Sequence, residues 1–230
     1  MYKGFFKRLI DILVSFTAIC VLLPIYLILI LLVALFLGRP VFFRQVRPGK
    51  SNKLFSMWKF RTMTNQKDEN GNLLPDEKRL TKFGRFLRSA SLDELPQLWN
   101  ILKGDMSIVG PRPQLVRDMV FFDEKTNIRQ SVTPGLTGYA QIKGRNNVDW
   151  DEKFENDLIY IQKITFLKDL AIVFKTVGKV LSRKDVSPVG SPVGESYCDW
   201  LLKNGRITKE EHDRGVQRAN EMISEFKRKK

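Results

Sequence analysis

Two adjacent carboxylates, Asp93 and Glu94, stand in a strongly basic part of the chain. The basic residues near them are Arg79, Lys82, Arg85, Arg88, Lys103 and Arg112. A carboxylate attacks phosphorus only where the negative charge of the electrophile is neutralised, which is a task for Arg, Lys and a divalent cation. The pair therefore indicates catalysis on a phosphorylated substrate, with Asp93 and Glu94 as the catalytic candidates.

The same pair also fits a structural role. Ser91-Leu92-Asp93-Glu94 has the pattern of a capping box, in which a Ser hydroxyl and a Glu carboxylate accept hydrogen bonds at the start of a helix. Pro96 opposes this interpretation, because it would fall inside such a helix and remove a backbone hydrogen bond. A helix that begins at Pro96 instead leaves both carboxylates in the preceding turn.

Four cations are candidates for binding phosphate. Arg112 lies between two prolines in Gly110-Pro111-Arg112-Pro113, and this restricted backbone suits bidentate contact with phosphate, although an ordinary turn arginine would look the same. Lys59 and Arg61 lie in a strand-like segment, 55–63, whose two-residue period predicts that both side chains share one face. Together they could hold one phosphate, and Arg88 is the fourth candidate.

The rest of the composition narrows the chemistry. The formal charge of +14 predicts a polyanionic partner, which could be nucleic acid, anionic lipid or a phosphorylated substrate. The single histidine, His212, lies in a charged C-terminal stretch, and the two cysteines, Cys20 and Cys198, are far apart in sequence. Zinc-protease motifs, Ser-His-Asp and Cys-His catalysis and a disulfide framework are therefore not expected.

A segment of 26 residues, from Ile12 to Leu37, contains no charged residue and is long enough to cross a bilayer as a helix. One interpretation is a straight spanning helix. The other is a re-entrant hairpin, because basic residues flank the segment on both sides and favour the cytoplasm for both ends. Pro24 lies near the centre and favours a break there.

After this segment the pattern predicts a small, mainly helical domain. Eight basic residues and no acidic one lie in 39–67, and most of them are expected to contact anionic lipid headgroups. Residues 79–88 predict an amphipathic helix at the membrane interface or against the core. Further helices are expected at 151–166 and 168–181, and a linker-like repeat at 187–194 precedes a charged helical hairpin.

Several long motifs together resemble the small monotopic phosphoglycosyl transferases of the bacterial sugar transferase family. They are Arg47-Pro48-Gly49, KFRTM at 59–63, SLDELPQLWNILKGDMSIVGPRP at 91–113, PGLTG at 134–138 and Gly144-Arg145-Asn146, besides the apolar N-terminus. The resemblance covers about residues 1–187. It departs from the family pattern at Leu23-Pro24, where Ser-Pro is frequent, so the hydroxyl that would help cap the break is missing.

This resemblance implies transfer of a phosphosugar from a UDP-sugar to a polyprenyl phosphate such as undecaprenyl phosphate, with Mg²⁺ and release of UMP. Asp93 would be the nucleophile that forms a covalent aspartyl-phosphosugar, would also approach the metal ion, and would form a dyad with Glu94. Lys59, Arg112, Arg145 and Asp169 match family positions near the phosphates, the nucleotide or the rim of the site.

We therefore expect an α+β fold that is predominantly α-helical, with a re-entrant membrane helix at 12–37, interfacial amphipathic helices and a small β-sheet. The expected domains are the transferase, 1–187, and a linker with a helical extension, 188–230. The expected location is the cytoplasmic face of the bacterial inner membrane, in contact with anionic lipids and without nucleic acid. The alternative is a noncatalytic membrane-tethered binder of anionic lipid or nucleic acid. The sugar, the pathway, the oligomeric state and the role of the extension are left open.

Overall fold

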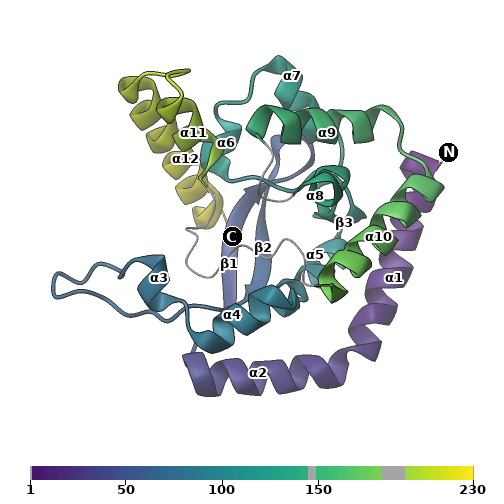
Figure 1. Ribbon diagram of the computed structural model, residues 1–230, viewed down its shortest axis with the longest axis horizontal. Coiled ribbons are helices and arrows are strands. Elements are labelled where there is room, and N and C mark those ends of the chain that lie inside the picture. Colours follow the sequence, from purple (N-terminus) through teal and green to yellow (C-terminus); the bar gives the residue numbers. More distant parts are fainter. Residues whose placement is uncertain (1, 145–148, 183–194, 230) are drawn as a thin grey trace.

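The computed structural model describes residues 2–144, 149–182 and 195–229 and is predominantly helical (Figure 1). The principal helices are α1 Lys7–Val21, α2 Leu23–Leu37, α3 Asp76–Arg79, α4 Lys82–Ser89, α5 Gln97–Lys103, α6 Val116–Met119, α7 Glu124–Asn127, α8 Tyr139–Lys143, α9 Trp150–Gln162, α10 Phe166–Leu181, α11 Tyr197–Lys203 and α12 Lys209–Arg228. The strands are β1 Phe42–Pro48, β2 Leu54–Phe60, β3 Ser107–Val109 and β4 Gly135–Thr137. The predicted fold class, mostly helical with little sheet, is confirmed.

The apolar N-terminus forms two helices that meet at a bend of 64° at Leu22. Among the described residues, no single helix is long and apolar enough to cross a membrane, whereas this bent pair meets the length and composition criteria together. Pro24 lies in the first turn of α2, where its missing N–H costs no helical hydrogen bond, and a backbone N–H at the break donates to the carbonyl of Cys20. The predicted break is thus present, and the straight helix is not.

The N-terminal helix is tied to the rest of the domain by polar contacts. Arg8 donates hydrogen bonds to the carbonyls of Ile101 (2.6 Å) and Leu102 (2.8 Å), which lie in the last turn of α5. Asp11 is buried and accepts a hydrogen bond of 3.0 Å from the backbone of Ile108 in β3. A guanidinium at a helix C-terminus satisfies carbonyls that have no partner within the helix. These contacts fix α1 against the segment that follows Asp93 and Glu94.

Arg61 has a different place from the one that the sequence predicted. Strand β2 ends at Phe60, so the two-residue period does not extend to Arg61. Its guanidinium is buried and donates to the carbonyls of Leu37, Gly38 and Arg39, at the C-terminal end of α2. These contacts give Arg61 a structural role, and its predicted contact with a phosphate beside Lys59 stays a prediction. Arg61 caps α2 and attaches it to the sheet.

The small sheet expected from the sequence consists of two separate pairs of strands within the described residues. β1 pairs antiparallel with β2, and β3 pairs parallel with β4. The β1–β2 hairpin directs Lys59 toward the turn that precedes α5, while β3 leads directly into Gly110-Pro111-Arg112. Gly110 contacts the backbone of Thr133 and Gly135 so closely that a β-carbon there would clash. The two strand pairs thus bring Lys59 and Arg112 to Glu94.

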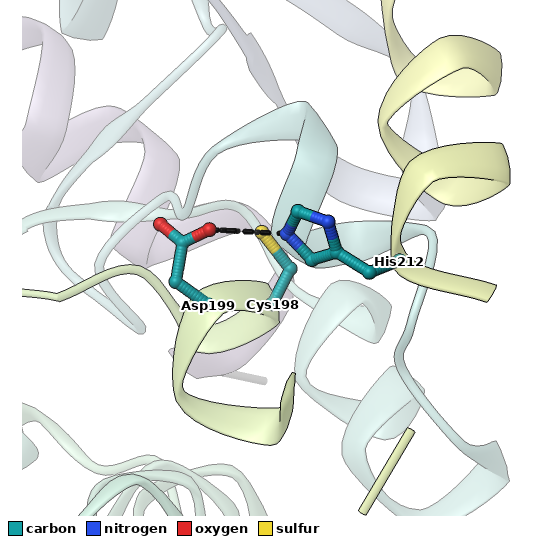
Figure 2. Close-up of side chains that lie close together, drawn as sticks. All are labelled: Cys198, Asp199 and His212. Atoms are coloured by element: carbon teal, nitrogen blue, oxygen red, sulfur yellow. Dashed lines mark hydrogen bonds and ion pairs between the residues drawn. The ribbon is translucent and has the colours of Figure 1, made fainter. Parts of the chain in front are cut away.

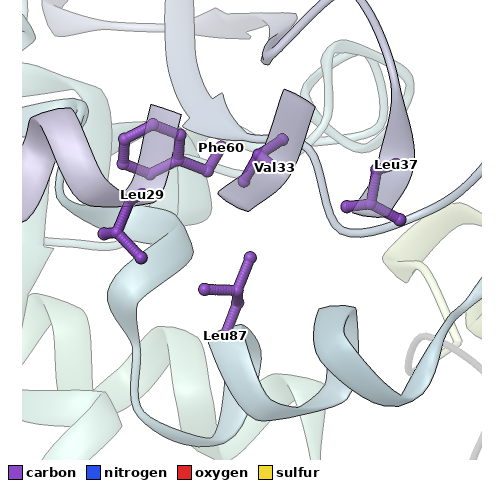
Figure 3. Packing of buried hydrophobic residues seen from close by; sticks show 5 residues of the cluster. All are labelled: Leu29, Val33, Leu37, Phe60 and Leu87. Atoms are coloured by element: carbon purple, nitrogen blue, oxygen red, sulfur yellow. The ribbon is translucent and has the colours of Figure 1, made fainter. Parts of the chain in front are cut away.

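Helix α4 covers α2, and their contact forms one apolar core (Figure 3). Leu87 of α4 is fully buried against Leu29, Val33 and Leu37 of α2 and Phe60 of β2. The amphipathic helix expected over 79–88 is therefore present in part, as α4, with its apolar face on α2. Phe86, also on α4, is exposed.

Exposed apolar side chains also occur on α10, whose first turn contacts the start of α1 through Asp169 and Lys7 (Figure 1). Leu167, Phe174 and Val177 are each at least half exposed, as are Leu13 and several other residues of α1 and α2. Exposed apolar surface of this extent is typical of a protein that contacts a membrane. The sequence predicted the helix at 168–181 but not its exposed apolar face.

Helices α11 and α12 form the predicted C-terminal hairpin. Ala219 of α12 is buried with Val46 of β1 and with Val116 and Met119 of α6. The predicted linker and the boundary at 187 lie outside the described residues. The packing of Ala219 shows that the C-terminal helices share a core with the sheet that carries Lys59.

The side chain of Asn100 joins α5 to β2. Its Oδ1 accepts from the backbone N–H of Trp58 (3.0 Å), and its Nδ2 donates to the carbonyl of Ser56 (2.8 Å). The side chain is buried, so its loss would leave two backbone groups without partners in the interior. Asn100 therefore sets the position of β2 relative to the turn with the carboxylates.

We expect Asn100→Leu to lower the free energy of unfolding by about 2–5 kcal/mol, since each unsatisfied buried group costs roughly 1–3 kcal/mol. Thermal unfolding of the purified protein in detergent measures the effect. Asn70→Leu is the matched control, because Asn70 lies exposed in a loop. Equal melting temperatures for the two variants would contradict this role for Asn100.

Candidate active site

Asp93 and Glu94 lie in a single 3-10 turn, Leu92–Glu94, directly before α5. Ser91 precedes the turn with φ of 54°, a left-handed conformation, and its side chain makes no capping hydrogen bond. Pro96 stands at the N-cap of α5. The capping box is therefore absent, and the prediction that both carboxylates lie in the turn before a helix is confirmed.

Two cations from separate elements hold Glu94. Lys59 of β2 places its Nζ 2.6 Å from Glu94 Oε1, and Arg112 donates from Nη2 to the same oxygen at 2.7 Å. Lys59 Nζ is also 3.9 Å from Asp93 Oδ2. The structure thus brings together four of the predicted site residues from three separate segments of the sequence.

The two carboxylates differ in their electrostatics. Burial raises the pKa of Asp93 to about 6, against the opposing charge of Lys59. Burial alone would also raise the pKa of Glu94, but the charges of Arg112 and Lys59 hold that pKa well below its usual range. Glu94 is consequently a fixed anion engaged by two cations. Asp93 is buried, and its carboxylate forms no hydrogen bond with the described residues.

The backbone around Arg112 is held by two other arginines. Arg129 donates from Nη2 to the carbonyl of Arg112 (2.9 Å), and Arg47 donates to the carbonyl of Pro113 (3.2 Å). Arg129 is fully buried and pairs with Asp157 at 2.7 Å. Burial lowers the pKa of Arg47 to about 10, assisted by repulsion from Arg112. A charge-assisted hydrogen bond on each side fixes the direction of Arg112.

The sequence alone does not show that Arg47 and Arg129 support the backbone around Arg112. Arg47 belongs to the Arg-Pro-Gly motif, but its type and spacing do not reveal which carbonyl it meets. Arg129 follows Ile128 in a segment without a motif, and Asp157, its partner, is 28 residues further along the chain. A buried ion pair of this kind becomes visible only when the chain is folded.

Arg88 also lies at the site, on the last turn of α4. Its Nε donates to Thr62 Oγ1 at 3.0 Å, and its positive charge acts on Asp93 by lowering the pKa of that carboxyl. The position agrees with the prediction that Arg88 serves the same site as Asp93. Its remaining guanidinium nitrogens form no hydrogen bond with the described residues and can donate to an anion.

Asp169 is not brought to this cluster. It is buried at the start of α10, where its oxygens accept hydrogen bonds from Tyr2 (2.8 Å), Lys7 (2.5 Å) and Tyr160 (2.7 Å). The carboxylate therefore connects α10 with the N-terminal helix and with α9. The place that the family resemblance implies for Asp169, near the phosphates, the nucleotide or the rim of the site, stays a prediction. Arg145, the remaining candidate, lies outside the described residues.

Comparisons with known proteins point to sugar transferases. The family model described as bacterial sugar transferase matches residues 2–183. An uncharacterized sugar transferase of Bacillus subtilis, EpsL, is 48% identical over 191 residues, which cover 83% of this chain and 95% of EpsL.

Two longer relatives have names that state an activity. A UDP-glucose:undecaprenyl-phosphate glucose-1-phosphate transferase of Klebsiella pneumoniae is 43% identical, with 76% of this chain and 40% of that protein covered. An undecaprenyl-phosphate galactose phosphotransferase of Salmonella typhimurium is 37% identical, with 79% and 41% covered. The chain thus spans about two fifths of the length of these two relatives. The residues matched by the family model include the turn that carries Asp93 and Glu94 and end at 183, before the C-terminal hairpin begins.

Proposed function

The chain belongs to the bacterial sugar transferase family and is therefore a sugar transferase, and we propose that it transfers a sugar 1-phosphate from a UDP-sugar to undecaprenyl phosphate. UMP is the second product. The observation that carries this proposal is the pairing of Asp93 with Glu94 among Lys59, Arg88 and Arg112. Such a site suits two consecutive phosphoryl-group transfers, and membership in a transferase family favours it over a noncatalytic binder of anionic lipid or nucleic acid.

In the proposed mechanism a carboxylate oxygen of Asp93 attacks the phosphorus that bears the sugar. An Asp–O–P bond forms, the P–O bond to UMP breaks, and UMP leaves with the electron pair. An oxygen of the lipid phosphate then attacks the same phosphorus, and the Asp93 carboxylate leaves unchanged. Asp93 suits the role of nucleophile better than Glu94, because Glu94 is already engaged by two cations.

Glu94 and the cations have a supporting role in this scheme. Glu94 holds Lys59 and Arg112 side by side, and Arg112 is partly exposed, with 43% of its side chain accessible. Pre-placed cations stabilise the charge that accumulates on the phosphoryl oxygens without reorganising during the reaction. Arg88 supplies a further guanidinium on the side of Asp93.

Mg²⁺ is the metal ion that we propose for this site, and the residues fit it. Carboxylate oxygens are the ligands that Mg²⁺ prefers, and Asp93 has a buried carboxylate without hydrogen bonds to the described residues. When bound, the ion would neutralise charge on the diphosphate of the UDP-sugar. Asp93 would hold it, and Glu94 would keep the adjacent cations in place.

Catalysis is proposed to take place at the cytoplasmic face of the bacterial inner membrane. The exposed apolar faces of α1, α2 and α10 would contact the lipid, and the basic residues of 39–67 would contact anionic headgroups. The bend at Leu22 would let both ends of the helix pair return to the same side. The undecaprenyl carrier would then meet Asp93 close to the membrane surface.

We expect cysteines introduced at Lys3 and at Lys50 to react with an impermeant thiol reagent only from the cytoplasmic side. Both positions are exposed and flank the bent helix pair. Labelling of intact and of lysed cells, in a Cys20→Ser background, measures accessibility. Reaction at position 3 in intact cells would show a spanning N-terminus and contradict the re-entrant arrangement.

The direct test of function is a screen of UDP-sugars with the purified protein, undecaprenyl phosphate and Mg²⁺, scored by release of UMP. We expect one or a few UDP-sugars to be turned over, with the sugar phosphate recovered on the lipid. If folded protein turns over none of the UDP-sugars, the proposed activity is refuted.

A further inference from the structure

The C-terminal hairpin brings the only histidine of the sequence to one of its two cysteines (Figure 2). Cys198 and Asp199 lie on α11, and His212 lies on α12. Their possible ligand atoms all lie within 4.8 Å of one another. His212 Nε2 is 3.1 Å from Asp199 Oδ1, and Cys198 Sγ is 3.8 Å from the same oxygen. Three different ligand types thus converge from two helices.

The groups around this cluster are arranged as in a metal site. His212 Nδ1, on the far side of the ring, lies 3.2 Å from Asp213 Oδ1. In proteins, a histidine that ligates a metal commonly donates its other ring N–H to a carboxylate in this way. The second oxygen of Asp199 is held by Ser196 Oγ (2.5 Å) and Arg117 (3.2 Å). Asp199 Oδ1 is therefore the oxygen directed toward the sulfur and the ring nitrogen.

A catalytic role for the cysteine does not fit these contacts. His212 Nε2 meets Asp199 rather than the thiol, so the ring is not placed to take the thiol proton. A simple ion pair between His212 and Asp199 would also not account for the sulfur of Cys198 beside the same carboxylate oxygen. The combination of thiol, imidazole and carboxylate is typical of zinc ligands.

We propose that Cys198, Asp199 and His212 bind Zn²⁺. The site lies in the C-terminal hairpin, beyond residue 183, where the match to the family model ends. Its role is therefore separate from the family's transferase domain. On binding, the thiol loses its proton to solvent and its sulfur bonds to the metal. Water would complete the coordination from the side where Asp199 and Asp213 are partly exposed.

The metal would connect α11 to α12 and thereby hold α12 on the transferase domain. Ala219, about two turns beyond His212 on α12, is buried against α6, which follows the Arg112 segment. A ligand bound only by the folded state stabilises that state. Zn²⁺ would therefore stabilise the C-terminal hairpin without taking part in sugar-phosphate transfer.

The test uses the full-length protein in detergent, treated with a chelator and then loaded with Zn²⁺ or Co²⁺. We expect a stoichiometric amount of Zn²⁺ to remain after gel filtration, and a melting temperature higher than that of the metal-free protein. With Co²⁺, a thiolate-to-metal absorption band in the near ultraviolet should appear. Substoichiometric Zn²⁺, or a Co²⁺ complex without the thiolate band, would overturn the proposal, and neither result depends on a variant.

Variants then assign the ligands. Cys198→Ser should remove the thiolate band, His212→Gln should reduce Zn²⁺ retention, and Asp213→Asn should weaken affinity by about 10- to 100-fold, as for other partners of metal-bound histidines. Cys20→Ser, in the membrane helix, is the matched control and should leave binding unchanged. Full Zn²⁺ retention by a Cys198→Ser, His212→Gln double variant would place the metal elsewhere and overturn the proposal.

Discussion

Asp93→Asn is expected to abolish turnover, with a loss on the order of 10⁴-fold or more, as is typical when a catalytic nucleophile is removed. The amide nearly preserves the shape of the side chain but lacks the anionic oxygen that would attack phosphorus. It also leaves Glu94 in contact with Lys59 and Arg112, so the rest of the site should persist. Steady-state kinetics of UMP release measures the loss.

The same variant separates a nucleophile from a general base. A nucleophile forms a covalent adduct before the lipid enters, so the enzyme should follow ping-pong kinetics. Intact-protein mass spectrometry, after mixing with Mg²⁺ and the correct UDP-sugar without lipid, should show the mass of a phosphosugar on the native protein and none on Asp93→Asn. Kinetics that require a ternary complex, without any adduct, would leave Asp93 as a base or a metal ligand.

The control for this experiment is Asp76→Asn. Asp76 is exposed and forms a surface ion pair of 3.4 Å with Arg79, a kind of contact that contributes about 0–1 kcal/mol to stability. It should retain full turnover and form the adduct. Glu94→Gln should also impair turnover, because a neutral amide attracts Lys59 and Arg112 less strongly, but it should still permit detection of the adduct if Asp93 is the nucleophile.

The sequence predicted the centre of the site because local chemistry is visible there. Asp93 and Glu94 are adjacent acids among bases, and Pro96 marks the start of the next helix, so their presentation in a turn followed from backbone rules. The break near Pro24 followed in the same way. Each of these predictions depends on neighbours within a few residues along the chain.

The contacts that the sequence did not predict depend on distant partners. Arg61 lies one residue beyond the end of β2, and the two-residue period could not show that the C-terminal end of α2 would supply three carbonyls there. Asp169 meets Tyr2 and Lys7 across more than 160 residues of sequence. The partner of a buried charged side chain is set by which groups the fold places next to it. A single sequence does not identify that partner.

Lys59 is the cation for which local pattern and fold agree, and Lys59→Met is expected to reduce turnover about 10²- to 10³-fold. This is the range for loss of one pre-placed group that stabilises charge in a transition state. Methionine retains much of the length and apolar contact of the lysine stem while removing the charge. Glu94 would keep Arg112, but Asp93 would lose the cation 3.9 Å from its carboxylate.

Lys53→Met tests whether this effect belongs to the site or to the membrane surface. Lys53 directly precedes the same strand, is exposed and forms no side-chain hydrogen bond or ion pair with the described residues. As a headgroup contact it would contribute about 1 kcal/mol to membrane binding, which added anionic lipid can compensate. Turnover of both variants should be measured in vesicles with and without anionic lipid. If Lys59→Met and Lys53→Met lose the same activity and anionic lipid restores both, Lys59 acts as a lipid contact. A loss confined to Lys59→Met, with unchanged vesicle binding, assigns its charge to phosphate transfer.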